Sequence, residues 1–125
     1  MSKKTVEPRF SQSFLLSLFY ANCCTFLECL RQNSVPNVSL QNSIVEYPVT
    51  VTKLRTWISQ EIYPALKEAL TNDSALMRQV ATDKERVEDL FATWSNGLFS
   101  AQQNREIEEL TTKFSWLSTT YANHG

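Results

Sequence analysis

Apolar side chains recur every three or four residues along most of the chain, which is the spacing of one face of an α-helix. The pattern predicts four helices, over residues 10–32, 50–70, 75–96 and 101–122. The first helix has apolar residues on nearly every side, at Phe14, Leu15, Leu18, Phe19, Cys23, Phe26, Leu27 and Leu30. A helix of this kind is usually buried on every side, so we expect it at the centre of the fold.

The second predicted helix begins at Thr50, a residue type that caps helix N-termini. Val49 and Leu54 are placed to pack across its first turn. Pro64 lies within the helix and removes one backbone hydrogen bond, so we expect a kink near residues 60–63. The apolar stripe of this helix consists of Leu54, Ile58, Ile62, Leu66, Ala69 and Leu70.

The third predicted helix follows the turn-forming stretch TNDS at residues 71–74. Lys84 is the only charged residue on its expected apolar stripe, and we expect its aliphatic stem to reach water from the edge of the core. Thr82 and Glu85 form a capping-box pattern, so a new helix beginning there is the alternative. The stripe consists of Met77, Val80, Lys84, Val87, Phe91, Trp94 and Leu98.

The fourth predicted helix has the clearest start. Gly97 is suited to end the third helix, and Ser100 with Gln103 forms a capping box directly afterwards. Because the connection is so short, the two helices should form an antiparallel αα-hairpin. The apolar stripe of the fourth helix consists of Gln103, Ile107, Leu110, Phe114, Leu117 and Tyr121.

Four helices with apolar stripes predict an all-α protein, a four-helix bundle that ends in the αα-hairpin. Residues 33–49 contain two prolines and several Asn and Ser residues, and they form the long connection between the first two helices. We expect one domain over residues 10–122, with a flexible tail at residues 1–9 and a short tail at residues 123–125. Glycine, at 2 of 125 residues, is too scarce for a fold rich in β-hairpins.

The charge balance argues against nucleic-acid binding. Twelve basic and thirteen acidic residues nearly cancel, whereas a protein that neutralises phosphates usually has a basic excess or stripe. Folding could still bring Lys53, Arg55, Lys67 and Arg78 together, and a nucleic-acid regulator is therefore one alternative. The hydrophobic content of 42% and the charged content of 20% are those of a folded globular protein.

The three cysteines, Cys23, Cys24 and Cys29, all lie in the first helix. An odd number so closely spaced does not form a disulfide framework, and it favours a reducing compartment such as the cytoplasm. We expect these cysteines to act as small apolar side chains. The same stretch is not a good signal peptide or membrane span, because Asn22 and Glu28 interrupt it and no cleavage pattern follows.

The sequence contains no pattern that indicates catalysis, a metal or a cofactor. His124 is the only histidine and stands beside the last residue, where no group is held firmly enough for catalysis or metal binding. The carboxylates around Glu85 and Glu106 alternate with basic residues, as on a solvated helix surface. We therefore expect a protein that is not an enzyme and that holds no cofactor.

Two regions have fewer charges than a small bundle needs on its surface. Glu28 is the only charged residue between Phe10 and Leu30, and none follows Lys113. Trp116 lies in the second region, off the apolar stripe, where it either anchors a partner or packs within its own chain. The candidate interface residues are Phe19, Phe26, Trp57, Trp116 and Tyr121.

These features predict a helical protein that works by binding another protein, including copies of itself. An adaptor, an inhibitor, an assembly chaperone and a structural subunit all fit this description. The alternative is a ligand-binding bundle with an apolar pocket near Pro64 that holds a lipid or a pigment.

Overall fold

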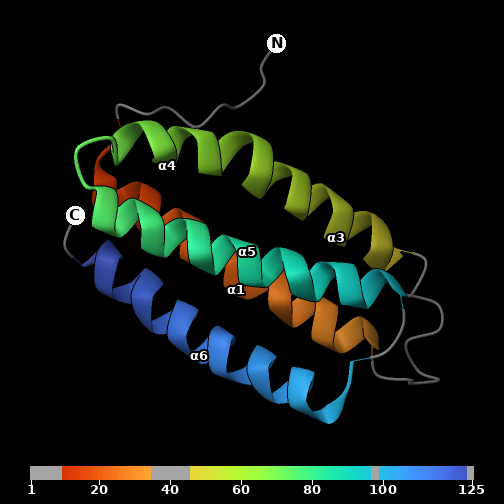
Figure 1. Ribbon diagram of the computed structural model, residues 1–125. Helices are drawn as coiled ribbons and strands as arrows, with labels where there is room; N and C mark the ends of the chain where they lie inside the picture. Colours follow the sequence, from red (N-terminus) through yellow and green to blue (C-terminus); the bar gives the residue numbers. More distant parts are fainter. Residues whose placement is uncertain (1–9, 35–45, 97–98, 124–125) are drawn as a thin grey trace.

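The computed structural model describes residues 10–34, 46–96 and 99–123 (Figure 1). The predicted tail at residues 1–9, most of the predicted tail at residues 123–125, Gly97, Leu98 and most of the connection after the first helix lie outside these ranges. The elements are α1 (Gln12–Ser34), α3 (Glu46–Trp57), the π-helical segment η2 (Ile58–Ile62), α4 (Tyr63–Ala69), α5 (Ser74–Asn96) and α6 (Ala101–Ala122). Since α3, η2 and α4 form one continuous helix, the fold is the predicted all-α bundle of four helices.

Polar side chains cap the N-termini of α1 and α5. The backbone N–H of Phe14 donates to Ser11 Oγ at 3.0 Å, so α1 begins just after Ser11 and leaves Phe10 outside the helix. The backbone N–H of Leu76 donates to Asp73 Oδ1 at 3.1 Å, which places the cap of α5 in the predicted TNDS turn. These side chains accept hydrogen bonds from N–H groups that have no partner inside the helix.

The predicted capping box at the start of α6 is confirmed. The backbone N–H of Gln103 donates to Ser100 Oγ at 3.1 Å, and the backbone N–H of Ser100 donates to Gln103 Oε1 at 2.9 Å. The chain turns back here, because side-chain contacts between α5 and α6 join Thr93 to Gln103, Arg86 to Glu106 and Asp83 to Lys113. As the residue numbers rise on one helix they fall on the other, so α5 and α6 are antiparallel, as predicted.

The second helix begins earlier than predicted. It starts at Glu46 and not after Thr50. Pro48 lies in the first turn, where a backbone N–H would have no partner in the helix, so proline fits there. The N-cap residue type of Thr50 therefore placed this start too late.

Pro64 changes the helix locally without ending it. The backbone widens to the π-helical segment η2 just before Pro64, and the N–H of Tyr63 donates to the carbonyl of Ile58. A π-helical turn is one way in which a helix accommodates a residue that cannot donate a hydrogen bond. The irregularity lies at Ile58–Ile62, which overlaps the predicted position at residues 60–63.

The buried side chains form one hydrophobic cluster to which all the helices contribute. Helix α1 contacts α3, η2, α4, α5 and α6, as expected for the most apolar helix (Figure 1). The stripes predicted for the second and fourth helices are confirmed. Their buried members are Ile58, Ile62, Leu66, Leu70, Ile107, Leu110, Phe114 and Leu117.

The predicted stripe of α5 needs correction. The helix runs through Thr82 without interruption, so no new helix begins there. Its buried residues are Val80, Asp83, Val87 and Leu90, while Met77, Phe91 and Trp94 are only partly buried. The side of α5 that faces the core is thus rotated around the helix axis relative to the predicted side. Lys84 lies at the edge of the core, as expected, with its ammonium 4.9 Å from the centre of the Tyr63 ring and 3.8 Å from the Glu88 carboxylate.

Helix α1 is not buried on every side, contrary to the prediction. Phe14, Ala21 and Thr25 face water, since the neighbouring helices leave one side of α1 uncovered. By length and composition, Gln12–Gln32 is also apolar enough to cross a membrane, although core helices of soluble proteins pass the same test. In the structure 44% of that apolar window is buried within the protein.

Candidate functional site

Two of the five predicted interface residues lie inside the core. Phe19 and Phe26 are fully buried, and their rings pack against Tyr63 and Phe91 at 6.3 and 5.8 Å between centroids. In this fold their side chains present no surface to a partner. Their apolar character is explained by packing within the chain.

The other three predicted residues differ in exposure. Trp57 and Tyr121 are partly buried against the core, and the Tyr121 ring stacks on Tyr20 at 6.2 Å. Trp116 is 64% exposed. Of the two possibilities left open by the sequence, packing within the chain is therefore excluded for most of the Trp116 side chain. An interface residue has to lie on the surface, and Trp116 does.

Three large hydrophobic side chains are exposed among the residues that the structure describes, and all belong to α1, its N-terminal flank or α6. They are Phe10, Phe14 and Trp116, with exposed fractions of 38%, 49% and 64%. The Phe10 and Phe14 rings contact each other edge to face, with centroids 5.3 Å apart. Single exposed apolar residues are common on proteins, but a group of them indicates an interaction surface.

Two grooves between α1 and α6 place these aromatic residues on the same side of the bundle. One groove, of about 550 Å³, has Cys24 and Glu28 on the α1 side and Thr111, Thr112, Ser115, Trp116 and Thr119 on the α6 side. The other is lined by Ser11, Phe14, Ser17, Tyr121 and Ala122. We call them the Trp116 groove and the Phe14 groove.

The two grooves lie on the same side of the helix pair, one beyond the other along its length. Ser17 and Cys24 are about two turns apart on α1, and Ser115 and Ala122 are about two turns apart on α6. Residues at this spacing lie on the same side of a helix. The exposed residues that line the two grooves, together with Phe10, form a surface that we call the α1–α6 face.

The α1–α6 face has almost no charge. Glu28 is the only charged residue that lines either groove, and its carboxylate lies 4.0 Å from the Arg31 guanidinium. Charged residues are depleted in the cores of protein interfaces and aromatic residues are enriched there. Low charge and exposed aromatic rings therefore coincide on this face.

Cys24 is the thiol that lines the Trp116 groove. Its Sγ donates a weak hydrogen bond to the Thr111 carbonyl at 3.5 Å. Partial burial, followed by the negative charge of Glu28, raises the pKa of Cys24 above its ordinary value. The group is therefore a neutral thiol near pH 7, and it packs as a small apolar side chain.

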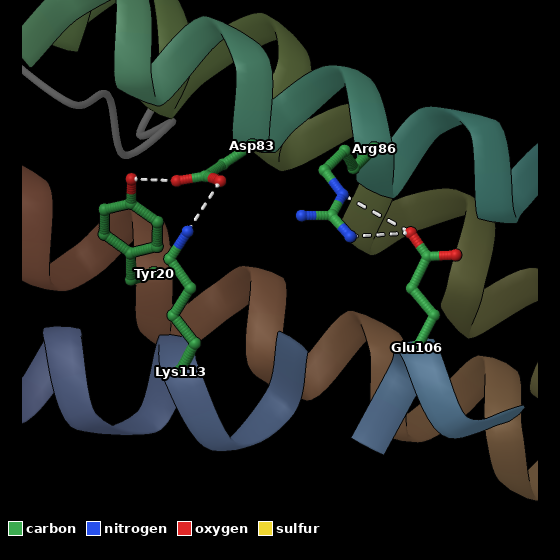
Figure 2. A network of polar contacts seen from close by, with 5 residues as sticks. All are labelled: Tyr20, Asp83, Arg86, Glu106 and Lys113. Atoms are coloured by element: carbon green, nitrogen blue, oxygen red, sulfur yellow. Dashed lines mark hydrogen bonds and ion pairs between the residues drawn. The ribbon is translucent and has the colours of Figure 1, made fainter. Parts of the chain in front are cut away.

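A buried polar network joins three helices, α1, α5 and α6 (Figure 2). The Tyr20 hydroxyl on α1 donates to Asp83 Oδ2 on α5 at 2.6 Å, and Lys113 Nζ on α6 donates to Asp83 Oδ1 at 3.3 Å. Asp83 is only 2% exposed, whereas the Lys113 side chain is 45% exposed. A buried carboxylate needs such partners, so the network holds α1, α5 and α6 in one arrangement.

The sequence prediction missed Asp83, although a signal was present. Asp83 stands three residues after Val80 and four before Val87, which are both buried. A stripe read from Val80 through Asp83 to Val87 would have placed a carboxylate in the core. The stripe was instead assigned through Lys84, which is adjacent in sequence and only partly buried.

We expect the protein to lose stability at alkaline pH. Burial, and then the hydrogen bond to Asp83 and its negative charge, raise the pKa of Tyr20 well above the ordinary value of 10.0. The unfolded chain then releases its proton at lower pH than the folded chain, so the free energy of unfolding falls as the pH rises past about 10. Burial raises the pKa of the Cys23 thiol in the same sense.

Urea unfolding between about pH 8 and pH 11 measures this effect. In Tyr20→Phe the free energy of unfolding should fall less steeply than in the wild type, because one of the contributing groups is gone. Equal slopes for the two proteins would contradict the assignment to Tyr20.

No metal-binding cluster occurs in the described part of the chain, where no three His, Cys, Asp or Glu residues are grouped as ligands. Cys23, Cys24 and Cys29 are all free. Cys23 is buried, and Cys24 and Cys29 are partly buried.

Two of the four basic residues considered for nucleic-acid binding contact other side chains of the protein. The Arg55 guanidinium lies 2.7 Å from the Glu88 carboxylate and 4.8 Å from the centre of the Phe91 ring. Lys67 lies over the Tyr63 ring at 5.5 Å. The Arg55 contacts join α3 to α5, whereas the Lys67 contact lies within α4.

The region proposed for a ligand pocket is packed on one side and open on the other. Ile58 and Ile62 of η2 are buried in the common core, and Pro64 faces solvent. The apolar side chains near Pro64 thus contribute to the hydrophobic cluster.

Comparisons with known proteins yield no relative. No family model matches the chain, and no curated protein or solved structure is significantly similar to it.

Proposed function

We propose that this protein works by binding protein, and that it self-associates through the α1–α6 face. The observation that carries the proposal is the grouping of Phe10, Phe14 and Trp116, the exposed large hydrophobic residues of the described ranges, on one nearly uncharged surface. Aromatic rings exposed to water do not stabilise a monomer, whereas binding a partner would bury their apolar surface away from water.

The proposal joins two regions that are far apart in the sequence. The charge-poor stretch of α1 and the charge-free end of α6 lie side by side, because α1 and α6 pack along their lengths. A partner would therefore meet one surface and not two separate ones. Three free cysteines support a reducing compartment such as the cytoplasm as the place where this occurs.

Static light scattering of a face variant tests the proposal. In the wild type we expect the weight-average molar mass to rise above 14.4 kDa as the concentration increases. The double variant Phe14→Ser, Trp116→Ser should stay at the monomer mass and keep its helical circular dichroism, because both side chains are exposed.

Glu85→Ser is the matched control, since Glu85 is exposed on α5, which contributes no residue to the α1–α6 face. It should associate like the wild type. If the face variant associates as strongly as the control, the α1–α6 face is not the contact surface.

A further inference from the structure

We propose that the partner at the α1–α6 face is a second copy of this chain, related by a two-fold axis, and that the Trp116 indole of each copy lies in the Trp116 groove of the other. This inference rests on the proposed function and specifies its geometry. It assigns the groove beside Cys24 and Glu28 as the site that receives the indole.

The α1–α6 face carries both a projecting side chain and a groove beside it, so it can be complementary to a second copy of itself. The exposed Trp116 ring projects from α6, and the groove of about 550 Å³ lies directly beside it between α1 and α6. In a two-fold dimer the same patch meets itself, so a projection and a groove that adjoin each other are both used twice. The groove is open to solvent, and Trp116 itself forms part of its lining.

The low charge of the face also favours a second copy as the partner. Glu28 is the only charged residue lining the grooves, and the Arg31 guanidinium lies 4.0 Å from its carboxylate, so a strongly acidic or basic partner would meet little opposite charge on this face. A second copy brings an equally uncharged face. The indole N–H requires an acceptor once it is buried, and the groove supplies the hydroxyls of Ser115 and Thr119 as well as the Glu28 carboxylate.

The area of the α1–α6 face indicates how tightly two copies would bind. From Phe14 to Glu28, α1 runs about 20 Å, and two helices of about 10 Å diameter give the face a width of about 20 Å. Two such faces cover on the order of 800 Å² in projection, which is below the roughly 1,200–2,000 Å² of stable specific interfaces and is typical of weak, transient ones. The dimer should therefore be reversible, with dissociation in the micromolar range or weaker.

The alkylation rate of Cys24 reports on the groove. Cys23 is fully buried and should not react in the folded protein, so Cys29→Ser leaves Cys24 as the reactive thiol. We measure its reaction with iodoacetamide over a series of protein concentrations at a mildly alkaline pH. If the indole of the partner covers Cys24, the rate falls about tenfold once nine-tenths of the chains are dimeric.

Cys24→Ser is the matched control, because it leaves Cys29 reactive. Positions 24 and 29 point about 140° apart around a helix, so Cys29 lies on another side of α1 and its rate should not change with concentration. Adding Trp116→Ala to Cys29→Ser should make the Cys24 rate independent of concentration as well.

The outcomes separate this inference from the proposed function. If sedimentation shows self-association and the Cys24 rate does not fall relative to that of Cys29, the groove is not the indole site, although the face hypothesis stands. If the wild type does not self-associate at any concentration, both the second copy as partner and the proposed self-association are wrong.

Discussion

Replacement of Trp116 by alanine is expected to weaken self-association at least about 30-fold, because an aromatic anchor in an interface typically contributes about 2 kcal/mol or more. The melting temperature should barely change, since the side chain is 64% exposed and little packing is lost. Light scattering over a dilution series measures the dissociation constant, and circular dichroism measures the melting curve.

The opposite pattern would show that Trp116 has a structural role. If Trp116→Ala lowers the melting temperature by several degrees and leaves the dissociation constant unchanged, the indole stabilises its own chain. Glu85→Ala, an exposed change on α5, should affect neither measurement by more than about 0.5 kcal/mol.

Replacement of Asp83 by alanine should strongly destabilise the fold. The Tyr20 hydroxyl would lose its acceptor inside the core, and the hydrogen bond to a charged group would be gone. Together these losses are expected to cost about 3 kcal/mol of unfolding free energy. For a chain of this length the melting temperature should fall by roughly 10 °C, as measured by calorimetry.

A second variant separates the network from simple loss of volume. Tyr20→Phe combined with Asp83→Leu removes both buried polar groups and keeps the core filled, so it should recover much of the stability lost in Asp83→Ala. Lys113 is half exposed and can extend into water in this variant. If Asp83→Ala melts at the wild-type temperature, the network does not stabilise the fold.

The sequence predicts the helices well because their signals are local. Ser100 and Gln103 form the expected capping box, and the stripe from Ile107 to Leu117 is buried as expected. Hydrogen bonds at a helix start involve residues within one turn, so they can be recognised without the fold. The start at Glu46 was missed because Thr50 has the residue type of an N-cap although it lies inside the helix.

The candidate site could be predicted only in part. Low charge in α1 and at the end of α6 is visible in the sequence, as is the position of Trp116 off the apolar stripe. That these two regions form one face depends on the packing of α1 against α6, which involves residues far apart in the chain. Phe19 and Phe26 look like interface residues until the other helices are seen to cover them.

The π-helical segment and the buried carboxylate show a second limit. Pro64 indicates an irregular helix, but the choice between a kink and a π-helical turn depends on how Ile58 and Ile62 fit the core. Asp83 is buried in the core, although aspartate is usually found on the surface. The Tyr20 and Lys113 groups that hydrogen-bond to its carboxylate come from two other helices. Neither the π-helical turn nor the burial of Asp83 can be recognised from the neighbouring residues in the sequence.

Sedimentation equilibrium of the wild-type protein, from about 1 µM to about 1 mM, tests the central claim most directly, because this range spans the expected dissociation constant. The account predicts a molar mass that rises with concentration from 14.4 kDa toward twice that value and fits a reversible monomer–dimer equilibrium. A strictly monomeric protein of 14.4 kDa over the whole range would contradict self-association through the α1–α6 face.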